Sequence, residues 1–106
     1  MDDVFHALAH RARRDMLGRL AGTELTVGEL AEPLEMSLAA ASKHIQVLER
    51  AGLVGRTVEG RRHVCRLEPA PLATAAEWLA SYERYWTGRL DALERLFANH
   101  LDQEDR

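Results

Sequence analysis

The hydrophobic and polar positions of this 106-residue chain predict several helices, of which the central one begins at Ser37 and stops at Gly52. Its apolar positions fall three or four residues apart, which is the spacing of one helix face. The positions expected to face a core are Ile45, Leu48, Ala51 and Leu53. The opposite face carries short or polar groups, so this helix, taken as residues 37–51, can bury one side and reach into a groove with the other.

Two short strands are predicted directly after that helix, over residues 53–67. The segment is rich in β-branched residues, and Glu59-Gly60 supplies a turn whose glycine permits the required backbone conformation. Residues 37–66 hold six Lys or Arg against two Glu, a local charge of +4 in a chain whose total is −3. A local concentration of positive charge is typical of a surface that follows a nucleic-acid backbone.

The segment before residue 37 predicts three shorter helices. An apolar stripe marks the first, and a second helix that ends near Gly22 turns five residues to a core: Ala12, Met16, Leu17, Leu20 and Ala21. Thr26 and Glu29 fit a capping box that starts the third helix, and Pro33 should end it near Glu32. This short helix, the turn at Glu35-Met36 and the 37–51 helix together predict a helix-turn-helix.

A long amphipathic helix is predicted over residues 70–103, with apolar residues three or four apart from Leu72 to Phe97. About thirty helical residues extend roughly 45 Å, which is more than one small domain can cover. The surplus apolar face therefore predicts a homodimer, through both the first and the last helix. The candidate dimerisation residues are Val4, Phe5, Leu8, Leu79, Trp86, Leu90, Leu93 and Phe97.

The central segment resembles the recognition helix and wing of the ArsR (arsenical-resistance-repressor) family of bacterial winged helix-turn-helix transcription factors. The matching stretches are Ser42-Lys43-His44-Ile45, Leu48-Glu49, Ala51-Gly52-Leu53-Val54, Glu59-Gly60-Arg61-Arg62 and Arg66-Leu67, and the likeness extends along nearly the whole chain. It implies a mainly α fold with a small β-hairpin, in the order ααααββα, as one dimeric domain over residues 1–106. It also implies a DNA-binding transcriptional regulator, a homodimeric repressor of operator DNA.

The resemblance assigns DNA contacts to the 37–51 helix and the 53–67 wing. Leu38 and Ala39 stand where many relatives have hydrogen-bonding residues, so they can only touch a thymine methyl or fill space. The predicted DNA-binding residues are Ser37, Leu38, Ala39, Ser42, Lys43, His44, Gln46, Arg56, Arg61 and Arg62. Arg11, Arg13 and Arg14 are further candidates for a flanking phosphate. Where relatives commonly have Asp-Pro-Thr this chain has His10-Arg11-Ala12, which leaves the start of the second helix less sharply defined.

Metal sensing occurs in several branches of this family, but the chain lacks the ligand patterns. Residues 26–34 contain no cysteine for an arsenic-type site, which needs soft thiolates. The zinc-type candidate on the last helix is His100 with Asp102 and Glu104, and His6 with His10 has no third ligand. We therefore predict no metal and no cofactor.

Cys65 is the single cysteine, which excludes an intramolecular disulfide. We interpret it as a small buried hydrophobe, or as a redox sensor if Arg62 or His63 lowers its pKa. An effector-switched sensor (metal, thiol or small molecule) and a protein-docking winged helix are thus the alternatives to a plain repressor. The chain has no Gly-rich phosphate loop or catalytic triad pattern, so we predict no enzyme. It also has no long apolar run or secretory signal, which predicts a cytoplasmic protein without a membrane partner.

Overall fold

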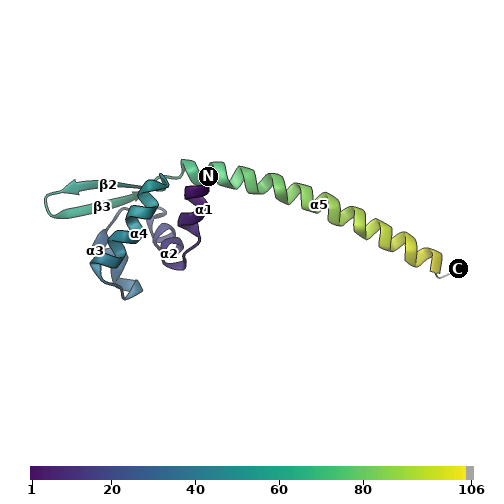
Figure 1. Cartoon of the computed structure of the whole chain (residues 1–106), viewed down its shortest axis with the longest axis horizontal. Helices are drawn as coiled ribbons and strands as arrows, with labels where there is room; N and C mark the ends of the chain where they lie inside the picture. The colour runs from purple at the N-terminus through teal and green to yellow at the C-terminus, as the bar shows by residue number, and fades with distance from the viewer. Residues whose placement is uncertain (105–106) are drawn as a thin grey trace. The chain divides into compact units, whose positions relative to one another are not determined.

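The computed structural model describes the backbone of residues 1–104 and the side chains of residues 1–99. Its contacts separate two compact units, Met1–Ala75 and Ala76–Arg106. The elements in chain order are α1 (Asp2–Leu8), α2 (Arg11–Leu20), β1 (Leu25–Thr26), α3 (Val27–Ala31), a 3-10 turn (Glu32–Leu34), α4 (Leu38–Arg50), β2 (Val54–Glu59), β3 (Arg62–Leu67) and α5 (Ala70–Glu104) (Figure 1). The predicted mainly α fold with a β-hairpin is confirmed.

The helix-turn-helix forms from local signals. Thr26 Oγ1 accepts a hydrogen bond from the Glu29 amide at 3.2 Å, and Glu29 Oε1 accepts one from the Thr26 amide at 3.0 Å, so the predicted capping box starts α3. Pro33 lies in the 3-10 turn where α3 ends, and Glu35 then turns the chain in a left-handed conformation at φ 52°. Ser37 caps α4 by accepting a hydrogen bond from the Ala40 amide at 3.1 Å.

α2 has a sharper beginning than the sequence indicated. The Nδ1 atom of His10 accepts a hydrogen bond from the Ala12 amide at 3.1 Å, so an imidazole caps the helix. The helix ends at Leu20, and the expectation that Ala21 would face the core is wrong because Ala21 lies just beyond that end and is exposed. Gly22 follows with φ 100°, a conformation that glycine adopts without steric cost.

The wing is an antiparallel hairpin whose register runs from Val54 opposite Leu67 to Glu59 opposite Arg62. Gly60 stands at its tip with φ 61°. The two-residue strand β1 pairs with β3 and completes a sheet in the order β1-β3-β2. The sequence did not predict β1, because two residues are too few to show an alternating pattern.

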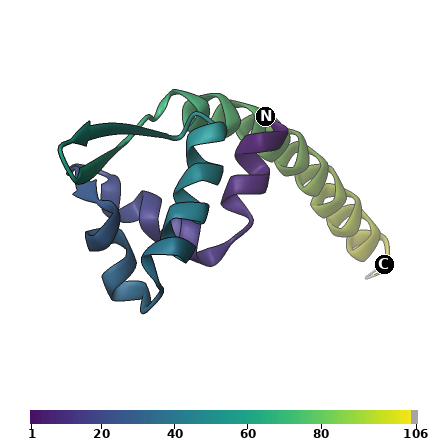
Figure 2. The same cartoon turned by 60° about the vertical axis from the view of Figure 1, so that its left-hand side comes forward.

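The core of the first unit lies where α4 packs on α1, α2, α3 and the base of the wing (Figure 2). The four residues predicted to face the core, Ile45, Leu48, Ala51 and Leu53, are all buried, and so is Ala75, near the beginning of α5. Val4 is also buried here, at 5% exposure, whereas Phe5 and Leu8 are only partly covered. Val4 therefore belongs to the core of its own protomer, and Phe5 and Leu8 retain surface that a partner can cover.

The second unit is the remainder of α5, and its apolar side chains are exposed. The five predicted dimerisation residues of this helix are at least half exposed: Leu79, Trp86, Leu90, Leu93 and Phe97. Aromatic contacts run along the same helix, with the Trp78 and Tyr82 ring centroids 4.7 Å apart and the Arg89 guanidinium 4.7 Å from the Tyr85 centroid. Within the described part of the chain, no helix combines the length and apolarity needed to cross a membrane.

Candidate nucleic-acid interface

The outward face of α4 carries most of the predicted DNA-binding residues. Because Ala41, Ile45 and Leu48 are buried on one side, the residues between them point elsewhere. Five are exposed: Ser37, Leu38, Ala39, Lys43 and Gln46. Ser42 and His44 are half-buried. The helix therefore offers a surface of small and polar groups, with one large apolar side chain, Leu38, 61% exposed at its N-terminal end.

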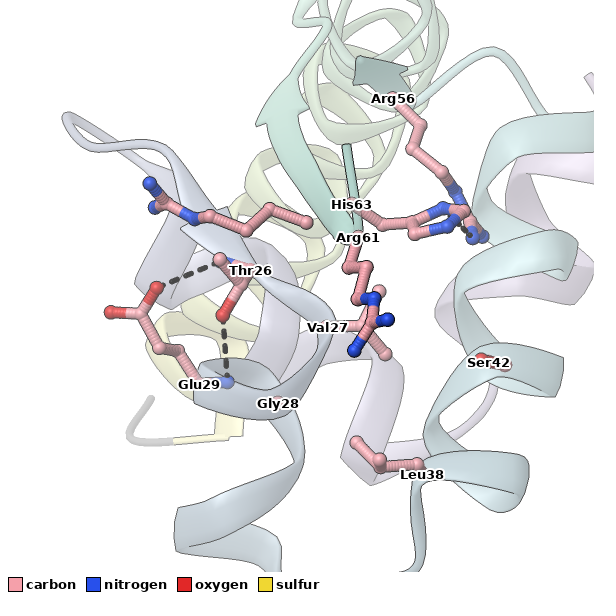
Figure 3. Close-up of a pocket in the computed structure, with 10 residues that line it drawn as sticks. Thr26, Val27, Gly28, Glu29, Leu38, Ser42, Arg56, Arg61 and His63 are labelled. Carbon is pink, nitrogen blue, oxygen red and sulfur yellow. Dashed lines mark hydrogen bonds between the residues drawn. The ribbon is translucent and has the colours of Figure 1, made fainter. Parts of the chain in front are cut away.

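A groove of about 740 Å³ separates the helix-turn-helix from the wing. Its walls come from the start of α3, the first half of α4 and the hairpin (Figure 3). The lining residues are Thr26, Val27, Gly28, Glu29, Leu38, Ser42, Arg56, Arg61, Arg62 and His63. Arg61 extends from the wing into this space (Figure 3). The structure thus places three wing arginines and two α4 residues around one groove.

The four wing arginines fall into two classes. Arg61 and Arg62 are exposed beside the hairpin tip, where a phosphate can approach them. Arg66 is paired, because its Nε donates to Glu68 Oε1 at 2.9 Å and its Nη1 donates to Thr57 Oγ1 at 2.9 Å. The freely available positive charge of the wing is therefore concentrated at its tip.

Arg56 is the second paired arginine, and it joins the wing to the recognition helix. Its Nη2 donates to Glu49 Oε1 of α4 at 2.5 Å, and its Nη1 lies 3.3 Å from His63 Nδ1 on the neighbouring strand. The Arg56 side chain is only 18% exposed. These contacts show that Arg56 connects β2 to α4. A role of Arg56 in DNA binding stays a prediction.

Arg13 and Arg14, proposed from the sequence as phosphate contacts, both donate hydrogen bonds to backbone carbonyls of α1. Arg13 is buried, and its three guanidinium nitrogens contact the Ala7 carbonyl, the His6 carbonyl and His44 Nδ1. Arg14 is exposed but donates to the Leu8 carbonyl at 2.8 Å. The sequence did hold a signal for Arg13, because it precedes Met16 by three residues and Leu17 by four, which places it on the apolar face of α2.

Glu29, which lines the groove, and Cys65, in the core on β3, have shifted pKa values. Hydrogen bonds from the Thr26 backbone and then the Thr26 side chain lower the pKa of Glu29, and the charges of Arg62 and Arg19 act in the same direction. Glu29 therefore stays ionised as the reciprocal cap of α3. Burial raises the pKa of the fully buried Cys65 thiol, although the charge of Arg56 opposes that rise. The neutral thiol is the less reactive form, which favours the buried-hydrophobe interpretation of Cys65.

The described residues include no group of three or more His, Cys, Asp or Glu placed to hold a metal ion. The candidate set of His100, Asp102 and Glu104 lies outside the described side chains.

The comparisons with known proteins identify the family. A model of the helix-turn-helix domain matches residues 8–56. The HTH-type transcriptional regulator Rv2034 of Mycobacterium tuberculosis is 39% identical over 101 residues, which span 95% of this chain and 92% of that protein. The crystal structure of an ArsR family transcriptional regulator, RHA00566, superposes with a TM-score of 0.76 and 38% identity over 81% of this chain and 89% of that one. The chain belongs to the ArsR family of winged helix-turn-helix transcriptional regulators.

Two more similar proteins bear on how this member of the family acts. The transcriptional repressor SdpR of Bacillus subtilis is 27% identical over 82 residues, or 77% of this chain and 91% of that protein. A homodimeric winged helix-turn-helix DNA-binding domain, Mb0332 from Mycobacterium bovis, has a TM-score of 0.62 and 31% identity over 79% of this chain and 80% of that one. These relatives include both a named repressor and a homodimer.

Proposed function

We propose that this ArsR-family chain is a homodimeric repressor that binds operator DNA through the 37–51 helix in the major groove and the 53–67 wing beside it. The observation that carries the proposal is the exposed polar face of α4, which borders the same groove as Arg61 and Arg62 at the wing tip. An α-helix fits the major groove of B-DNA, and arginines at a wing tip can follow a phosphate or enter a narrow minor groove.

Each part of α4 has a different role in this proposal. Ser37 and the helix N-terminus can hold a phosphate, since unpaired amides and the helix dipole favour an anion there. Ser42, Lys43, His44 and Gln46 can reach base edges or phosphates by hydrogen bonding. Leu38 and Ala39 offer only apolar contact, so we expect modest base discrimination supplemented by the shape of the DNA.

Dimerisation is proposed through the exposed apolar stripe of α5 together with Phe5 and Leu8 of α1, in a single domain spanning residues 1–106 to which the 70–103 helix contributes the interface. The homodimeric relative Mb0332 supports a dimer for this chain. Two copies of α4 on a two-fold axis would read two half-sites in successive major grooves. We further propose that the protein works in the cytoplasm, where operator DNA is found, and that it catalyses no reaction.

The experiment that tests this function begins with a duplex selected by the wild-type protein from a random-sequence library. Affinity for that duplex and for a random duplex is measured at several salt concentrations, and transcription from a promoter that carries the selected site is measured with and without protein. We expect a steep fall of affinity with salt from counterion release, and lower transcription. A flat salt dependence would favour a protein-docking module, and increased transcription would overturn repression.

Substitutions in the helix and in the wing should impair DNA binding in different ways. Arg61→Ala or Arg62→Ala removes a positive charge that meets a phosphate or the minor groove, so affinity should fall for both duplexes. The salt slope should drop by about one for each phosphate that is no longer neutralised. Ser42→Ala or Lys43→Ala should instead weaken binding to the selected duplex by about 1–3 kcal/mol relative to the random duplex. The two roles would be reversed if the helix variants weakened affinity for both duplexes equally and only the wing variants reduced the preference for the selected duplex.

Binding to the selected duplex should not depend on a metal ion. We expect affinity to change less than about tenfold, or roughly 1.4 kcal/mol, when EDTA is added or when Zn(II) is titrated in. The measurement is made on the full chain, so that His100, Asp102 and Glu104 are present. A larger change in either direction would replace the plain repressor with a metal-switched sensor.

A further inference from the structure

Arg13 is a charged side chain buried beneath the DNA-reading face, with 8% exposure. Its Nε donates to the Ala7 carbonyl at 2.7 Å, and its Nη2 donates to the His6 carbonyl at 3.0 Å. Both carbonyls belong to the C-terminal end of α1, where the helix dipole is negative, and the His6 carbonyl also accepts from the Ala9 amide at 3.2 Å. Arg13, on α2, therefore ties down the end of α1, and this helix end compensates the buried charge.

The third nitrogen of Arg13 reaches the recognition helix. Arg13 Nη1 lies 3.2 Å from His44 Nδ1 on α4. A guanidinium group can only donate hydrogen bonds, so Nδ1 must accept one. His44 is consequently neutral, with its proton on Nε2. The His10 ring flanks His44 with a centroid separation of 4.5 Å, and its own Nδ1 also accepts, from the Ala12 amide.

We propose that Arg13 is a positioning residue that couples α1 to the recognition helix through neutral His44, and that a proton on His44 breaks this coupling and weakens specific DNA binding. The proposal rests on the proposed DNA-reading role of α4. It links a helix expected at the dimer interface to the helix expected in the major groove. Arg13 and His44 are 31 positions apart in the sequence, so their contact fixes how α2 lies against α4.

The charges around His44 set the direction of the pH dependence. Arg13 on α2 and His10 at its N-cap face the ring, and α1 contributes the carbonyl groups held by Arg13. Protonation would remove the acceptor at Nδ1 and place a second positive charge beside the buried guanidinium. Burial, followed by the charges of His10 and Arg13, lowers the pKa of His44 below its ordinary value.

This lowered pKa means that the unfolded chain takes up the proton first as pH falls. The contribution of neutral His44 to the stability of the folded protein is complete above the ordinary histidine pKa of about 6.5. It is lost as pH falls from there through the pKa of His44 in the folded protein. Simple attraction to DNA predicts the opposite trend, because protonated histidines add positive charge next to phosphates. The sign of the pH effect on specific binding therefore separates the coupling from general electrostatics.

The DNA arm of the test uses the duplex selected by the wild-type protein, at constant salt, at about pH 8 and about pH 5.5. We expect wild-type affinity to fall by more than about threefold on acidification, while affinity for a random duplex holds or rises. His44→Asn places an amide oxygen near the position of Nδ1, so it keeps an acceptor that does not titrate. Its affinity should change by less than about threefold over the same interval, whatever its value at pH 8.

His6→Asn is the matched control, because the His6 side chain is exposed and only its backbone carbonyl meets Arg13. This variant should follow the wild type at both pH values. A wild-type affinity that holds or rises on acidification would overturn the proposal. So would a His44→Asn variant whose affinity falls as steeply as that of the wild type.

Nitrogen-15 NMR of the histidine rings in the free, full-length protein tests the coupling without DNA. We expect an unprotonated Nδ1 on His44 at about pH 8 and a titration of His44 below the ordinary histidine pKa of about 6.5. In Arg13→Gln, which removes the neighbouring charge, the titration of His44 should move toward that ordinary value. A proton on Nδ1, or titration of wild-type His44 at or above the ordinary histidine pKa, would refute the coupling. Failure of the wild type to bind any duplex would instead refute the proposed function.

Discussion

The double substitution Leu90→Glu and Leu93→Glu is expected to convert the protein from a dimer to a monomer. Both side chains are at least half exposed in the protomer, so the changes should leave its fold intact. In the dimer they would place unpaired carboxylates in an apolar interface, which is costly without a compensating partner. Removal of the second DNA-reading helix should then reduce affinity for the selected duplex by about 100-fold or more, since linked sites gain about 10²–10⁴ in avidity.

Sedimentation velocity measures the oligomeric state, and circular dichroism checks that the helices remain. The matched control is Thr87→Glu with Ala98→Glu, which adds the same two charges on the helix stripe that also carries Asp91 and Glu94. This control should stay dimeric. A Leu90/Leu93 variant that remains dimeric, or a control that dissociates equally, would show that the interface lies elsewhere.

The second large effect is expected from Leu53→Ala, at the junction of the recognition helix and the wing. Leu53 is fully buried, its amide donates to the Leu48 carbonyl at 3.0 Å, and its carbonyl accepts from the Glu68 amide at 2.8 Å. Truncating a buried leucine costs about 2–5 kcal/mol, because apolar burial is reduced and a residual cavity remains. That is a large part of the roughly 5–15 kcal/mol by which a domain is stable.

Urea denaturation at fixed protein concentration gives the free energy of unfolding for this comparison, because dimerisation makes stability depend on concentration. Val58→Ala is the control, since Val58 lies on β2 but is 59% exposed and should change the free energy by less than about 0.5 kcal/mol. Similar destabilisation of both variants would mean that Leu53 is not the anchor of the wing.

Much of the fold could be predicted because its signals act over a few residues. The capping box at Thr26, the stop at Pro33 and the positive φ angles of Gly52 and Gly60 each depend on neighbours in sequence. The buried face of α4 follows from its helical period in the same way. β1 escaped prediction because its two residues become a strand only by pairing with β3.

The candidate site was predictable to a lesser degree. The sequence located the helix, the wing and their excess of positive charge, but it could not distinguish a free arginine from a paired one. Arg61 and Arg62 are exposed at the wing tip, whereas Arg56 is bound to Glu49 and Arg66 to Glu68. The apolar pattern similarly assigned Val4 to an interface, and the structure buries it in the core of its own protomer.

The sequence by itself determined the helices, the hairpin of the wing and which broad surface is basic, because hydrogen bonding and periodicity within a segment are local properties. Only the tertiary structure decided which of the charged and imidazole groups remain available to DNA. Arg13 and His44 stand 31 positions apart, and their contact exists only because α2 and α4 pack against each other. Burial beneath that packing, rather than residue type, makes one arginine a structural tie and leaves another free for a phosphate.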